Sequence, residues 1–296
     1  MKTTKTLILL SATIAISSFF TSCSKDKGCT DPVALNFDKK AETDDGSCIY
    51  PTPTPTPTPS TEANVAIDLD HFFNGVGVSS TNFNQIIFTN AFGNNLSISK
   101  VRYLLSNFKF HRGHPHHDTI TINDFKLVDL SVPGSDVLVL SQKLPKGDYE
   151  GLSFTLGFIP TDNISNFYPS LNSVNWNWPA ALGGGYHYLQ LEGQFVDSSS
   201  ATVNYAYHWG TAREITVTND TIFHPNFGNA NLANNAYTIS ADDVEFHLFV
   251  NLDQWFENPN TWDLNVYNTM LMPNFQAQQL MQQNSATVFE FDHLHN

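Results

Sequence analysis

Alternating apolar and polar positions run through this chain from about residue 63 onward. From Val65 to Phe73, every second residue falls in one mainly apolar phase, and Asp68 and Asp70 fall in the other. Side chains two positions apart lie on the same face of a strand, so the pattern predicts a half-buried strand. His71 falls in the apolar phase, where a core residue is expected.

Further alternations follow, separated by turn signals such as Pro133-Gly134. The other predicted strands cover residues 85–88, 96–110, 119–130, 137–141, 149–157, 186–196, 201–209, 213–218, 236–253 and 286–291. A short helix is predicted at residues 275–284, and residues 158–182 are irregular. Short strands with turns at intervals of about ten residues are typical of sandwiches and barrels. We therefore expect an all-β fold, an antiparallel β-sandwich with long irregular loops.

The first 60 residues differ in composition. Residues 1–22 join a basic start to an apolar run, and Phe20-Thr21-Ser22-Cys23 fits a bacterial lipoprotein cleavage box. This predicts a signal peptide and a lipid on Cys23, with an ordinary signal peptide as the alternative. Alternate prolines in residues 51–61 predict an extended linker. The predicted parts are the signal peptide 1–22, a small module 23–50, the Pro-Thr linker 51–61 and a β-sandwich domain 62–296.

The small module holds two more cysteines. With Cys23 lipidated, Cys29 and Cys48 remain as a pair in an oxidising compartment, which predicts a disulfide. The runs Cys-Thr-Asp-Pro and Asp-Asp-Gly-Ser-Cys resemble a short disulfide-closed motif that recurs in surface and secreted proteins of the Bacteroidetes. The acidic turn offers oxygen ligands for calcium, although a spacer closed by one disulfide is the simpler interpretation. We expect a cell-envelope protein, periplasmic or on the outer-membrane surface, held to the membrane by its lipid alone.

Charge and missing motifs exclude several functions. From residue 61 onward, 8 Lys and Arg stand against 22 Asp and Glu. Such a surface repels phosphate backbones, so no nucleic-acid partner is expected. The sequence contains no nucleophile elbow, HExxH helix or phosphate-binding glycine loop. We therefore expect a protein that is not an enzyme.

The densest candidate chemistry lies between residues 176 and 210. Trp176 and Trp178 precede three glycines and a strand in which His187 shares a phase with Leu189 and Leu191. The next aromatic strand ends near His208, which falls in its polar phase. Imidazole suits zinc, copper and nickel, and Glu192 offers a carboxylate to orient a ligating histidine. Each histidine alone, His71 included, is more commonly satisfied by an ordinary hydrogen bond.

Other histidines carry weaker predictions. Those between His111 and His117 crowd one loop and would bind metals adventitiously. His247 falls in the polar phase of its strand and is expected to be exposed. His293 and His295 belong to the tail and carry less weight still.

In their order along the chain, several segments resemble the MbnP-like copper-binding domain family. The segments are Leu69–Gly75, Ile98–Asn107, Leu144–Tyr149, Phe154–Gly157, Trp176-x-Trp178, Tyr186-x-Tyr188-x-x-x-Glu192-Gly193, His208-x-Gly210 and Asn251–Phe256. The resemblance covers about residues 63–291. It departs from the family pattern in a longer spacing between Trp178 and Tyr186, and in Val174 where a methionine is common.

The resemblance implies a copper protein of the cell envelope. It implies Cu(I) held by two histidines and a kynurenine made from tryptophan, with a dihaem cytochrome c peroxidase-like enzyme as the oxidising partner. By position, it points to His71 and His208 as ligands and to Trp178 or Trp176 as the modified residue. His187, which follows Trp178 closely in the sequence, is a further ligand candidate apart from the resemblance. The rival hypothesis is a stalked surface module that binds glycan or protein, without metal, through aromatic residues between 166 and 178.

Overall fold

The structure, a computed structural model, describes residues 25–51, 60–232 and 235–296. The predicted signal peptide, Cys23 and most of the Pro-Thr linker lie outside the described residues. The chain divides into two compact units, Met1–Pro59 and Ser60–Asn296. Within the described ranges, no helix has the length and apolar character needed to cross a membrane.

The first unit is built around one disulfide. Strands β1 (Lys27–Gly28) and β2 (Thr43–Asp44) pair in parallel, and Cys29 is bonded to Cys48 with an S–S distance of 2.08 Å. The predicted disulfide is therefore confirmed. In the acidic turn, carboxylate oxygens of Asp44 and Asp45 accept backbone N–H groups two residues further on, at 3.0 Å. These carboxylates thus stabilise their own turn.

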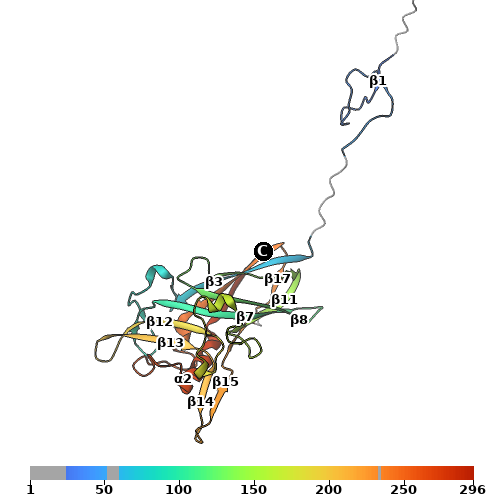
Figure 1. The fold of residues 1–296 in the computed structure, drawn as a ribbon. Helices are drawn as coiled ribbons and strands as arrows, with labels where there is room; N and C mark the ends of the chain where they lie inside the picture. The colour runs from blue at the N-terminus through green and yellow to red at the C-terminus, as the bar shows by residue number, and fades with distance from the viewer. Residues whose placement is uncertain (1–24, 52–59, 233–234) are drawn as a thin grey trace, which may run out of the picture. The chain divides into compact units, whose positions relative to one another are not determined.

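The second unit is a β-sandwich, as predicted (Figure 1). One sheet runs in the order β10-β3-β18-β19, with β4 and β9 also paired to β3. Its strands are β3 (Glu62–Phe73), β4 (Val76–Gly77), β9 (Val137–Val139), β10 (Leu144–Pro145), β18 (Asp243–Asn251) and β19 (Phe289–His295). One pair departs from the antiparallel expectation, because β18 lies parallel to β3. A parallel pair needs a long crossover, and here the entire other sheet lies between the two strands in sequence.

The other sheet, called here the site sheet, runs in the order β16-β11-β7-β12-β6-β5, with β8, β13 and β17 branching from it. Its strands are β5 (Phe88–Thr89), β6 (Asn95–Leu96), β7 (Lys100–Arg112), β8 (Thr119–Asp129), β11 (Gly147–Leu156), β12 (Leu189–Val196), β13 (Thr202–Trp209), β16 (Gly228–Leu232) and β17 (Tyr237–Ile239). The inward side chains of both sheets form one continuous core. The site sheet therefore has one face in that core and one face turned outward.

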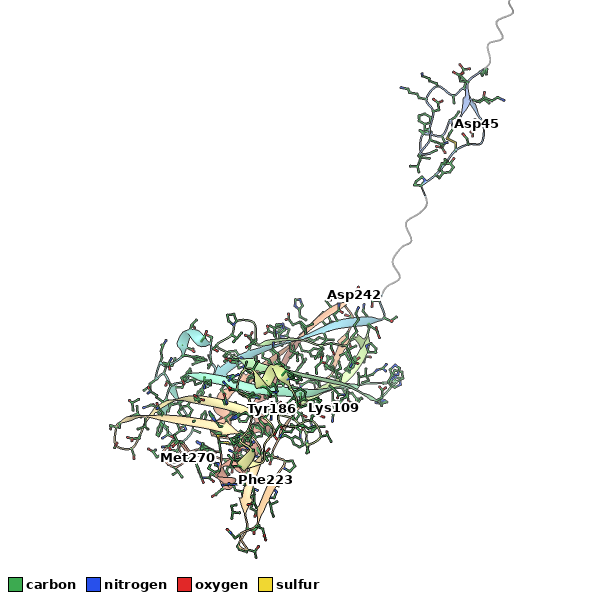
Figure 2. The ribbon with its side chains drawn as sticks, viewed as in Figure 1. Asp45, Lys109, Tyr186, Phe223, Asp242 and Met270 are labelled. Carbon is green, nitrogen blue, oxygen red and sulfur yellow. A yellow bond between two sulfur atoms is a disulfide. The ribbon has the colours of Figure 1, made fainter. Side chains whose placement is uncertain are left out.

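The outer face of β7 is covered by the predicted irregular segment. This segment contains α1 (Pro169–Asn172) and the 3₁₀ turn η2 (Ala180–Leu182). Leu171, Trp176 and Tyr186 form a second, smaller apolar cluster with Leu104 and Phe158. Tyr186 lies among packed side chains inside the domain, whereas Phe223 lies on the projecting hairpin (Figure 2). The segment thus shelters part of the outer face from water.

Short elements complete the domain. The hairpin of β14 (Ala212–Ile215) and β15 (Thr221–His224) projects from the sandwich, beside α2 (Phe275–Asn284) in Figure 1. The 3₁₀ turns are η1 (Ser80–Asn82), η3 (Leu252–Phe256) and η4 (Ser285–Thr287). Helix α2 has the bounds expected from sequence, and the Asn274 side chain caps its start by accepting the N–H of Ala277 at 3.0 Å.

Candidate metal centre

A tight reversal brings both tryptophans of the 176–178 segment beside His187. Gly183, Gly184 and Gly185 have φ values of 108°, 67° and 84°, a left-handed conformation that glycine adopts without steric cost. The chain folds back so that Trp178 N–H donates to the Gly185 carbonyl at 2.9 Å. The N–H of His187 donates to the Trp176 carbonyl, also at 2.9 Å. The glycine run is therefore the turn that builds the centre.

His187 does not lie on the face predicted for it. The strand predicted at residues 186–196 begins only at Leu189, and Leu189 and Leu191 point into the main core. His187 instead contacts the indoles on the outer side. Its ring centroid lies 5.4 Å from that of Trp176 and 4.9 Å from that of Trp178. The backbone pairing of 176–178 with 185–187 holds these residues off the sheet, so the alternation does not extend to them.

His208 meets His187 from the neighbouring strand. In the β12–β13 register, His208 is the partner of Gln190, one position away from the core-facing Leu189 and Leu191. Its side chain is therefore on the outer face of the site sheet. The two imidazole rings lie 5.4 Å apart, nearly perpendicular, at an interplanar angle of 89°. The structure thus brings together His187, His208, Trp176 and Trp178.

The His187 ring is buried and its Nδ1 atom is unsatisfied. The residue is 5% exposed, and Nδ1 has no hydrogen-bond partner among the described atoms. Burial and, after it, the nearby His208 lower the pKa of His187 to about 3. The ring is therefore neutral at any physiological pH. Burying a polar atom without a partner costs free energy. A neutral imidazole keeps a lone pair on one ring nitrogen, and a metal ion can bind there.

His208 is held by a carboxylate. Its Nε2 lies 2.8 Å from Glu192 Oε1, and Lys100 Nζ lies 2.7 Å from the same oxygen. These two partners, His208 first, lower the pKa of Glu192 to about 2. When Nε2–H donates to Glu192, the lone pair of His208 is on Nδ1. Glu192 thus lies where it orients the imidazole.

Two cations of this centre were not recognised from sequence. Arg102 lies over the Trp176 ring, 4.9 Å from its centroid, and pairs with Asp129 at 3.0 Å. Lys100 and Arg102 occupy the outward phase of β7, opposite the buried Val101 and Tyr103. The signal was present in the Lys-Val-Arg-Tyr alternation, which places two cations on one face of a strand.

The Trp178 ring is fixed on two sides. Its Nε1–H donates to the Leu182 carbonyl at 3.1 Å, and one face of the ring packs against Gly210, where a Cβ atom would approach it to 2.6 Å. Trp176 is fully buried, and its Nε1 has no partner among the described atoms. The two indoles thus lie in different environments beside the same imidazole.

The structure places His71 elsewhere. It lies on the core side of β3, where its Nε2 is 2.7 Å from the hydroxyl of Tyr103, and burial lowers its pKa to about 4. Tyr103 points into the core from β7, whereas His208 is on the outer face of the same sheet. His71 and His208, the pair to which the resemblance pointed, are therefore on opposite sides of the site sheet. His71 also lines a separate groove of about 570 Å³ together with Val78 and Asp136.

The centre offers imidazole nitrogens as donors for a metal ion. Two imidazoles meet beside two electron-rich rings, with the His187 ring buried and the His208 side chain 19% exposed. Imidazole donors in a poorly solvated site suit a soft monovalent or borderline ion. The Glu192 carboxylate beside them is hydrogen-bonded to His208 and Lys100, and its lowered pKa keeps it ionised.

The fold and this cluster define a β-sandwich protein with a two-imidazole, two-indole centre on the outer face of one sheet. The MbnP family profile matches residues 60–273, and the chain belongs to this family. Among solved structures, MbnP from Methylosinus trichosporium is similar, with a TM-score of 0.51 and 12% sequence identity. The match covers 78% of this chain and 99% of that chain, and at this identity it shows a shared fold. A search of curated proteins found no match.

Proposed function

We propose that this protein binds copper in the cell envelope through His187 and His208, beside a tryptophan oxidised to kynurenine. The observation that carries the proposal is the buried, unpaired Nδ1 of His187, whose ring faces a second imidazole at 5.4 Å. Membership of the MbnP family supports a copper-related role. Copper handling, rather than catalysis by this chain, is the function that we assign.

The donor set suits Cu(I). Burial keeps His187 neutral, and the hydrogen bond to Glu192 fixes the tautomer of His208, so each ring offers one lone pair. A low number of neutral donors in a dry surround favours the monovalent ion over the more strongly hydrated divalent one. His71 is satisfied by Tyr103 and is not part of this set.

Trp178 is the indole that we assign to modification. Arg102 lies over the Trp176 ring, and a cation beside an indole disfavours removal of its electrons. No cation lies over the Trp178 ring among the described residues, and this ring is the nearer of the two to His187. Oxidation therefore falls on Trp178.

The modification needs an oxidant, which we assign to a dihaem cytochrome c peroxidase-like partner. Two molecules of hydrogen peroxide each transfer one oxygen atom to the indole, one to C2 and one to C3, and each is reduced to water. That bond breaks to give N-formylkynurenine, and one water then releases formate. The aryl amine and ketone of kynurenine remain, close to the imidazole of His187.

The rival function, an aromatic binding platform on a stalk, has less support. Trp176 is 0% and Trp178 2% exposed, and Tyr168 is half-buried. Phe167, at 63% exposure, is the aromatic of this segment that reaches water. A glycan platform needs several exposed rings side by side, and this segment presents one. The proposal also includes a lipid on Cys23, which follows from the cleavage box in the sequence. Cys23 lies outside the described residues.

Copper retention tests the ligand set. The wild-type protein, loaded with Cu(I) and dialysed, is expected to keep about one equivalent. A variant with His187→Asn and His208→Asn should lose it, and His71→Asn should keep it. Retention in the double variant, or loss in the His71 variant, would overturn the assignment.

Intact mass of protein from its native host tests the modification. Kynurenine raises the mass by about 4 Da, since the indole loses one carbon and gains one oxygen in net. Trp178→Phe should abolish this increase, and Trp176→Phe should leave it in place. The opposite result would move the modification to Trp176, and an unmodified wild-type mass would refute kynurenine formation.

A further inference from the structure

The outward face of β18 and β19 carries a second cluster of imidazoles and carboxylates. In the antiparallel β18–β19 register, His247 is the partner of His293 and Glu245 is the partner of His295. The parallel β3–β18 register adds Asp68 beside His247. Residues two apart share a face, so all five side chains project from the same side of the sheet.

The distances fit a metal site. One ligand atom each from Glu245, His247 and His295 lies within 4.8 Å of the other two. The nearest carboxylates to the His247 ring nitrogens are Asp68 at 3.9 Å and Glu245 at 3.7 Å, both longer than a hydrogen bond. The rings of His247 and His293 stack in parallel, with centroids 4.4 Å apart. His247 thus has free lone-pair capacity next to acidic groups.

This cluster is separate from the copper centre. It belongs to the β10-β3-β18-β19 sheet, whereas His187 and His208 lie on the outer face of the site sheet. His293 and His295 also lie beyond residues 60–273, the part matched by the family profile. The cluster is therefore a feature of this chain and does not follow from the family match.

We propose that Glu245, His247 and His295 form a surface site for a divalent cation of the zinc type, with Asp68 and His293 beside it. Two imidazoles and one carboxylate are a common donor set for Zn²⁺, leaving a fourth position for water or another group. The side chains are partly exposed, so the ion enters directly from solvent. Bound metal would cross-link β19 to β18, two strands that are already paired.

Titration of the metal-free full-length protein with Zn²⁺ tests the site. Isothermal titration calorimetry should show one equivalent that is lost, or weakened at least about tenfold, in His247→Asn with His295→Asn. The matched control is His114→Asn with His116→Asn, two exposed histidines of the 111–117 loop, and it should keep that equivalent. Absence of zinc binding, its survival in the His247 and His295 variant, or its loss in the loop control would each overturn the proposal.

Two further variants separate the possible failures. Glu245→Gln removes a charge and keeps the size of the side chain, so it tests the site even if the double histidine variant unfolds. It should weaken zinc binding while leaving the circular dichroism spectrum unchanged, and unaltered affinity in this variant would count against the site. His187→Asn with His208→Asn should keep this zinc equivalent while losing Cu(I), so each proposal can fail without the other.

Discussion

Replacement of Gly210 by alanine is the sharpest test of the geometry around Trp178. An added Cβ would lie 2.6 Å from Trp178 Cδ2 and Cε3, closer than van der Waals contact permits. The backbone cannot easily withdraw, because Gly210 N–H donates to Gln278 at 3.0 Å and its carbonyl accepts from Asn226 at 3.1 Å. The indole is itself held by its bond to Leu182. The clash must therefore be relieved by moving the Trp178 ring.

The cost of such overpacking is typically about 1–3 kcal/mol. For a domain of this size, about 2 kcal/mol lowers the Tm by roughly 4–8 °C. Denaturant unfolding with a full baseline measures the free energy of unfolding directly. Tryptophan fluorescence of the folded variant should also shift, because the environment of Trp178 changes. On the proposed function, Cu(I) retention should weaken as well.

Gly77→Ala is the matched control. An added Cβ at Gly77 meets nothing within 4 Å, and its φ is not positive. This substitution should change the free energy of unfolding by less than about 0.5 kcal/mol. Equal stability of the two variants would refute the close packing of Trp178 on Gly210.

Three further predictions follow from buried and paired groups. The pKa of His71 is lowered to about 4, so the neutral ring stabilises the fold above the unfolded pKa near 6.5. This contribution is lost as pH falls from 6.5 through 4, and the free energy of unfolding should drop by roughly 3 kcal/mol. His71→Gln should flatten this part of the plot of unfolding free energy against pH. The pKa of Glu192 is lowered to about 2, so the ionised carboxylate stabilises the fold above the unfolded pKa of 4.5, and this stability is lost as pH falls towards 2. Glu192→Gln should remove this loss from the plot of unfolding free energy against pH, and an unchanged plot would argue against the pairing with His208. Serine at both Cys29 and Cys48, 19 residues apart, should destabilise the first unit by about 3 kcal/mol and leave the Tm of the second unit unchanged, as calorimetry would show.

Local patterns in the sequence were enough to predict most strands. The alternation from Val65 to Phe73 lies within β3, and the predicted strand at 119–130 is β8, at Thr119–Asp129. Residues 236–253 form two strands rather than one, because Ser240 and the residues after it interrupt the run between β17 and β18. These are properties of neighbouring residues, which a periodicity argument can capture.

The arrangement of the candidate sites depends on pairings that local patterns do not contain. His187 was predicted on the core face because alternation was extended back through residues 186 and 187, which pair with the 176–178 segment instead of continuing β12. His247 and His295 meet only because β19 pairs with β18, and strand register is set by distant contacts. The sequence did carry one signal for this cluster. Glu245 and His247 are two residues apart on one strand, as are His293 and His295 on another, so each pair shares a face.

The burial of the two indoles limits how any oxidising enzyme can act on them. A partner protein that docks on this folded domain does not reach the Trp178 ring, which is 2% exposed and packs against Gly210. What it can approach is the edge of the centre at His208, whose side chain is 19% exposed. On the proposed function, modification after folding requires either that residues 158–182 move away from the ring or that electrons leave through the imidazoles. Comparing how fast the proposed peroxidase-like partner oxidises a folded and a freshly diluted, still refolding chain would distinguish these routes.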